Sequence, residues 1–232
     1  MLTNEWITIP GGAFVYRVRH RIMEGDCQVE HGPVLLDMPA FEMQKYPVTN
    51  AMYREFLDQS GYAPADRANF LRHLDGPDAP DENAPVVWVS LTDAKAYAGW
   101  AGGALPSDAQ WQYAAGGPSR ARWPWGDEFR ADCMNGDGDR LTPVDRYPSG
   151  ASYWGLVDLC GNAWEWVDGP IDDGRHAFGL IRGGCHYRAR HFWHIAGGPH
   201  PNDSHEKVPL LGEALGRAAT VGFRCVRKAV GV

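Results

Sequence analysis

The chain has 232 residues, and its 22 Lys and Arg against 29 Asp and Glu give a formal net charge of −7. Its hydrophobic share of 44% and charged share of 22% are ordinary for a soluble globular domain and exclude a disordered, collagen-like or coiled-coil chain. The surplus of acidic residues argues against a nucleic-acid partner, because phosphate binding needs a basic surface. The 28 Gly, 17 Pro and 10 Trp predict a loop-rich domain held together by aromatic packing.

The first part of the chain predicts short strands and then a capped helix. Apolar and polar residues alternate, as in strands, over Trp6–Ile9, Phe14–Val18 and Phe41–Tyr46. Helical spacing of apolar residues then predicts a helix that begins at Thr49 or Asn50 and ends at Gly61. The polar, proline-rich stretch Gly61–Pro85 that follows is predicted to be a long surface loop.

Two further helices are predicted from capping boxes. Ser90 is followed three residues later by Asp93, and Ser107 by Gln110. Beyond residue 117 helical periodicity is absent, and the chain ends in a short predicted strand over Gly222–Arg227. Since no linker separates the two halves, we expect one α+β domain over residues 1–232.

The lack of recognisable targeting signals and the spacing of the cysteines predict a cytoplasmic protein that does not associate with a membrane. No apolar run approaches the roughly 18 residues of a membrane span, and the first residues lack the pattern of a signal peptide. The five cysteines form no C-x-x-C pair and no disulfide framework.

Eight segments, in order along nearly the whole chain, resemble motifs of the formylglycine-generating enzyme (sulfatase-modifying factor) family. They are Ile9–Phe14, Tyr46–Tyr53, Pro85–Ser90, Leu105–Gly117, Trp123–Asp127, Gly155–Trp166, Arg182–Gly184 and Gly222–Cys225. The resemblance implies an irregular, loop-rich α+β domain related to C-type lectin-like folds, with bound calcium and a groove for a peptide or small-molecule substrate. The Gly, Pro and Trp content independently agrees with such a fold.

The family binds structural calcium at two places that this chain can be compared with. At the first, the resemblance implies ligands from Asp158, Glu165 and the carbonyls of Gly161 and Ala163, which are the oxygen ligands that calcium prefers; the alternative is that the carboxylates only cap local turns. At the second, the corresponding residues are Asp132, Asn135, Asp137 and Asp139. The loop there is shorter than in the family, and a solvated acidic loop is the alternative.

The main departure from the family concerns copper. Members that make formylglycine bind copper(I) through two cysteines shortly after the Arg-Gly-Gly turn, since a soft ion favours two thiolates. Counted from the turn, these positions are Arg188 and Trp193 in this chain, and neither side chain can replace a cysteine. Cys185 stands where the family usually has serine, so the known copper route is not expected here.

Other chemistry could use the same segment. Cys185 with His186 could form a reactive thiol and base, and His191 or His194 could join them in a transition-metal site. The spacing matches no metal signature, so surface histidines and a thiol that fills the core are the alternatives. The resemblance also implies that Trp164 contacts substrate in the groove.

Three functions fit these features. The sequence narrowly favours an oxidative modification of a peptide or small molecule by chemistry other than the copper dithiolate. The second function is a non-catalytic, calcium-stabilised module that binds a ligand or protein. The third is an accessory part of an oxygenase system whose iron-carrying helical bundle lies on a partner. The long segment Ala196–Ala218 is then expected to contact that partner through an exposed aromatic patch.

Overall fold

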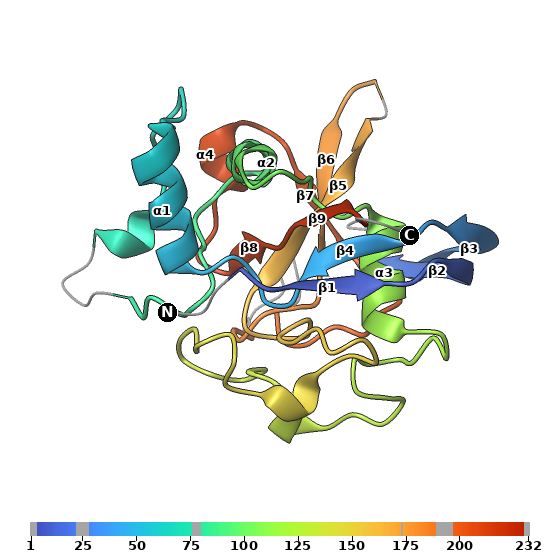
Figure 1. Ribbon diagram of the computed structural model, residues 1–232. Coiled ribbons are helices and arrows are strands. Elements are labelled where there is room, and N and C mark those ends of the chain that lie inside the picture. Colours follow the sequence, from blue (N-terminus) through green and yellow to red (C-terminus); the bar gives the residue numbers. More distant parts are fainter. Residues whose placement is uncertain (1–3, 22–27, 76–79, 173, 189–196, 230–232) are drawn as a thin grey trace.

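The computed structural model describes residues 4–21, 28–75, 80–172, 174–188 and 197–229. Its strands form three small sheets, shown in Figure 1. The first contains β1 (Trp6–Ile9), β4 (Phe41–Gln44) and β9 (Val226–Lys228), and the second is the hairpin of β2 (Gly12–Arg21) and β3 (Gln28–Met38). The third has the order β7 (Glu206–Pro209), β6 (Ala177–Arg182), β5 (Trp164–Asp172) and β8 (Val221–Phe223), with β8 parallel to β5.

The three longer helices begin where the sequence predicts, and the first also ends at the predicted glycine. They are α1 (Asn50–Ser60), α2 (Leu91–Trp100) and α3 (Asp108–Gly116). Thr49 caps α1, which ends at Gly61 in the left-handed region with φ 66°. Ser90 and Ser107 each form the full capping box with the residue three positions on, as expected.

The predicted single strand over Gly222–Arg227 is wrong in its extent. The segment is divided between β8, in the sheet with β5, and β9, in the sheet with β4. Arg224 and Cys225 lie between the two strands, where the Arg224 side chain turns inward to an ion pair described below. The second strand of the β2–β3 hairpin and the short α4 (Glu213–Gly216) were not predicted.

The core has two large aromatic-rich clusters and a small third one around Trp123. One lies between α1, α2 and the β5–β8 region and includes Tyr53, Tyr97, Trp166 and Phe223. The other lies between α3 and the N-terminal strands, with Trp111 at its centre. The coil between α3 and β5, yellow-green to yellow, forms the lower part of the molecule in Figure 1. No helix among the described residues is long and apolar enough to cross a membrane.

Candidate functional site

Strand β5 carries a buried carboxylate that is fixed by an ion pair. Glu165 is 1% exposed, and the fully buried Arg224 donates to both of its oxygens at 2.7–2.9 Å. The Trp111 indole also donates to Glu165 Oε2 at 2.7 Å. Arg224 further donates to the Val157 carbonyl at 2.9 Å, so this pair connects β5, the C-terminal segment and the loop before β5.

A second buried ion pair holds the Arg-Gly-Gly turn. Arg182 donates to the two oxygens of Asp108, at the start of α3, at 2.6 and 2.5 Å. The side chains of His205, at 3.1 Å, and Tyr16 also donate to Asp108 Oδ2. Burial alone would raise the pKa of Asp108, but Arg182 and the hydrogen bond from His205 hold it well below its usual range. Arg182 also donates to the Asn202 carbonyl at 2.7 Å and thereby ties the turn to the segment beyond residue 197.

Cys185 lies in the core. It is 2% exposed, its Sγ contacts the Tyr187 carbonyl at 3.3 Å, and burial raises the pKa of its thiol. A reactive thiol needs the opposite environment, with solvent access and a stabilised thiolate. This geometry favours the packing alternative over the predicted catalytic one, although it leaves the catalytic role a prediction.

His186 is hydrogen-bonded to the backbone of the neighbouring loop. It is 8% exposed, and its Nδ1 donates to the Asn162 carbonyl at 2.8 Å, as its own backbone N–H does at 2.9 Å. Among the described residues, no three His, Cys, Asp or Glu side chains are grouped so that they could hold a metal ion. The predicted metal ligands His191 and His194 lie outside the described residues.

Trp164 packs inside the domain. It is 2% exposed, and its ring centroid lies 4.6 Å from that of His200. Trp166 is fully buried in the core and donates to the Val89 carbonyl at 3.0 Å. Trp164 is therefore buried within the described part of the chain, and its contact with substrate stays a prediction.

The first predicted calcium site has a buried carboxylate but not the expected ligand set. Asp158 is 6% exposed and its backbone is left-handed, with φ 60°. Burial, reinforced by Glu165 and opposed by Asn162 and Arg224, raises the pKa of Asp158 to about 8. A cation would offset this cost, so Asp158 fits the calcium prediction. Glu165 fits less well, because each of its oxygens already accepts two N–H donors from Arg224 and Trp111.

The second predicted calcium site receives no support from the geometry. Asp132 is exposed and pairs with Arg130 at 2.7 Å, while Asp137 and Asp139 are exposed. The buried Asn135 amide donates instead to the carbonyl of Arg140 at 2.9 Å and to Asn162 Oδ1 at 3.1 Å. The four side chains therefore take different roles, which agrees with the alternative of a solvated acidic loop.

The segment 196–218 contains more secondary structure than a simple loop. It includes β7 and α4, and its exposed apolar side chains are Leu211, at 70%, and Leu215, at 69%. The segment contains no Phe, Tyr or Trp, so the aromatic patch expected for an accessory domain is wrong, and the exposed leucines are the apolar side chains that it presents instead.

The irregular strands, the three capped helices and the Arg-Gly-Gly turn define a loop-rich α+β domain of the formylglycine-generating-enzyme type, consistent with a C-type lectin-like fold. The chain belongs to the sulfatase-modifying factor enzyme 1-like domain family, whose sequence profile matches residues 2–229. The solved structures of PvdO from Pseudomonas aeruginosa and of CarF have the same fold. Each superposes with a TM-score of 0.69, at 20% and 17% identity, and they cover 97% and 99% of this chain and 94% and 100% of their own.

Two kinds of relative are similar in sequence. Hercynine oxygenase of Mycolicibacterium smegmatis is 32% identical over 194 residues, which cover 71% of this chain and 45% of that protein. The formylglycine-generating enzyme of Mycobacterium tuberculosis is 30% identical over 230 residues, which cover 72% of this chain and 74% of that protein. The chain therefore spans less than half of the hercynine oxygenase that it matches.

Proposed function

We propose that this chain is the substrate-binding part of a system that oxidatively modifies a peptide or small molecule. The oxidising metal centre then lies on another chain or on a further part of a longer one. The observation that carries the proposal is the burial of the Cys185 thiol. Arg188 and Trp193 occupy the positions of the family's copper cysteines, and the one thiol beside them is buried with a raised pKa. Divergent chemistry at Cys185 itself, which the sequence narrowly favours, would need an accessible thiolate.

The relatives support the proposal that substrate binding and the metal centre lie on different parts of the system. Hercynine oxygenase extends well beyond the part that matches this chain, so a comparable activity here would need further protein. Leu211 and Leu215 are the exposed apolar side chains that such a partner could cover within 196–218. Cys133, Cys160, Cys185 and Cys225 are free thiols, which supports a reducing compartment such as the cytoplasm.

We further propose that calcium stabilises the loop before β5. Asp158 and the carbonyls of Gly161 and Ala163 supply hard oxygen ligands on one tight turn. Glu165 acts mainly through its ion pair with Arg224. In this proposal calcium stabilises the fold and takes no part in the chemistry.

The test is purification of the tagged chain from the organism that encodes it, followed by iron and copper analysis. We expect iron in a complex with a second component, and we expect the iron to leave with that component when high salt separates the two. Cys185→Ala should give the same result. Iron or copper that stays with the isolated chain and is lost in Cys185→Ala would contradict the proposal, as would a chain that carries neither metal nor partner.

A further inference from the structure

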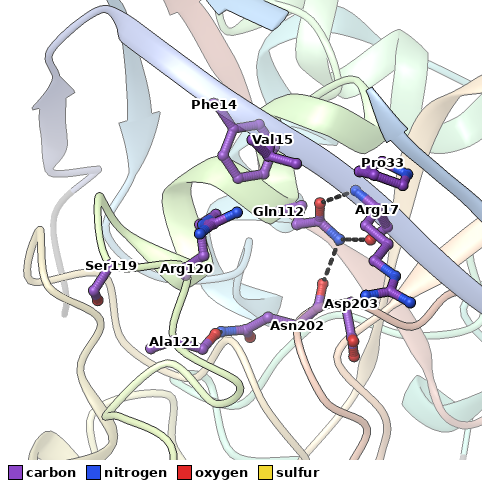
Figure 2. A pocket seen from close by; sticks show the side chains of 11 residues that line it. Phe14, Val15, Arg17, Pro33, Gln112, Ser119, Arg120, Ala121, Asn202 and Asp203 are labelled. Carbon is purple, nitrogen blue, oxygen red and sulfur yellow. Dashed lines mark hydrogen bonds between the residues drawn. The ribbon is translucent and has the colours of Figure 1, made fainter. Parts of the chain in front are cut away.

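A cavity of about 460 Å³ lies between the β2–β3 hairpin, the C-terminal end of α3 and the segment at Asn202 and Asp203 (Figure 2). This volume is within the range of small-molecule sites in proteins. None of its lining residues belongs to 158–165 or 182–188, although Asn202 in its wall accepts a hydrogen bond from Arg182 at 2.7 Å. Binding in this cavity does not presuppose the proposed function.

The cavity is built around an irregularity in the β2–β3 hairpin. The register shifts between Tyr16 and Val18, where the single residue Arg17 of β2 lies opposite Gly32 and Pro33 of β3, which form the bulge. The side chain of Gln112 bonds to both backbone groups of Arg17: its Oε1 accepts from the N–H at 3.2 Å and its Nε2 donates to the carbonyl at 2.6 Å. Bulges redirect strands and recur beside functional sites. This one is fixed to α3 by a buried side chain, so the wall of the cavity is preorganised.

Asn202 brings an unused acceptor to the opposite wall. The residue is 3% exposed, its Nδ2 donates to the Ala121 carbonyl at 2.9 Å, and its own carbonyl accepts from Gln112 at 3.1 Å. Its Oδ1 is buried and has no hydrogen-bond partner within the described part of the chain. Because a buried amide oxygen without a donor is unfavourable, this atom favours a ligand that carries an N–H group, which can reach it once the Asn202 amide turns toward the cavity.

Arg120 brings an uncompensated positive charge. Its φ is 57°, in the left-handed region that non-glycine residues rarely adopt, and Figure 2 shows it across Gln112 from Arg17. Arg17 pairs with Glu30, and Asp203 lies 3.7 Å from Arg19. Across the described ranges, no carboxylate pairs with Arg120. An anionic group on a ligand would therefore meet the one lining arginine that lacks a counter-ion there.

From these contacts we propose that the cavity binds a small carboxylate that also carries an N–H group and an apolar side chain, which is the chemistry of an N-acylated amino acid or a peptide C-terminus. Arg120 pairs with the carboxylate, Asn202 accepts from the N–H, and Phe14 and Val15 pack against the apolar part. A planar guanidinium suits a carboxylate because it can donate two parallel hydrogen bonds.

The test is a titration of the purified chain with N-acetyl-L-phenylalanine, followed by the side-chain amide signals of Gln112 and Asn202 in nitrogen-15 NMR spectra. We expect saturable shifts with a Kd below about 1 mM. Two matched probes separate the contacts: N-acetyl-L-phenylalaninamide lacks the charge, and 3-phenylpropanoate lacks the N–H. Each should bind about tenfold more weakly, because each loses one polar contact.

Variants test whether Arg120 supplies the positive charge that binds the carboxylate. Arg120→Gln should weaken binding of the acid about tenfold and leave binding of the amide unchanged. The control Arg146→Gln, at an exposed arginine outside the cavity, should change neither. Since Arg120 is exposed, we expect its variant to fold, which circular dichroism checks. The proposal is overturned if folded wild type shows no saturable binding of the acid below about 10 mM, if the amide binds as tightly as the acid, or if Arg120→Gln binds the acid normally.

Discussion

The ion pair between Asp108 and Arg182 makes a quantitative prediction about stability. Replacing Asp108 by Asn keeps the shape of the side chain but leaves the guanidinium of Arg182, which is 0% exposed, without its counter-ion. Breaking one side of a buried pair typically costs about 3 to 5 kcal/mol. For a chain of this length, that corresponds to a fall in Tm of about 6 to 20 °C.

A matched substitution controls for the change from Asp to Asn itself. Asp168 pairs with Lys95 at 2.7 Å, but these side chains are 46% and 45% exposed. Asp168→Asn should therefore cost at most about 1 kcal/mol. Urea unfolding at pH 7 measures both variants, and a lower midpoint with an unchanged m-value identifies a loss of stability rather than a changed unfolded state.

The dependence on pH gives a second readout of the same pair. The folded pKa of Asp108 is depressed, so its charge stabilises the fold above the pKa of about 3.9 that an unfolded chain shows, and this contribution is lost as the pH falls below that value. The gap between wild type and Asp108→Asn should be constant from pH 7 to about 5 and shrink below about 4. A loss of stability under about 1 kcal/mol at pH 7, or a gap that does not shrink in acid, would show that the Asp108–Arg182 pair does not stabilise the fold as proposed.

Three further predictions follow from buried groups. Cys185, being buried, should react with a thiol reagent only as fast as the protein unfolds; rapid modification of the native protein, absent in Cys185→Ala, would show an accessible thiol. Removal of calcium with a chelator should lower the Tm of wild type but not of Asp158→Asn, and an equal Tm for wild type with and without calcium would contradict the calcium proposal. Burial lowers the pKa of His73 to about 4, so its neutral form stabilises the fold above about pH 6.5, and this contribution is lost as the pH falls toward 4. His73→Gln should reduce that acid dependence in urea unfolding, and an unchanged slope would count against it.

The local signals in the sequence predicted the helices well. The capping boxes at Ser90 and Ser107 and the stop at Gly61 depend on residues within one or two turns, so they can be recognised without the rest of the fold. Strand ends were less accurate because pairing is not local. The break at Arg224 follows from its bond to Glu165, 59 positions away along the chain.

The site was predicted less well than the fold, for the same reason. Arg182 and Arg224 donate to backbone carbonyls of loops, as well as to carboxylates. Their carboxylate partners Asp108 and Glu165 could not be identified from sequence, because no local pattern connects residues 74 and 59 positions apart. The burial of Cys185 likewise depends on segments far from it in the chain. Apolar residues can be recognised in the sequence, but the way in which they bury the Cys185 thiol cannot.

We propose that this domain binds substrate and does not itself carry a redox centre at Cys185. The most direct measurement is copper(I) and iron binding by the purified chain, wild type against Cys185→Ala, in competition with a chelator of known affinity. We expect both proteins to lose the metal to the chelator to the same extent. One equivalent of either metal retained by wild type and lost from Cys185→Ala would contradict this proposal and would establish a metal–thiolate site in this domain.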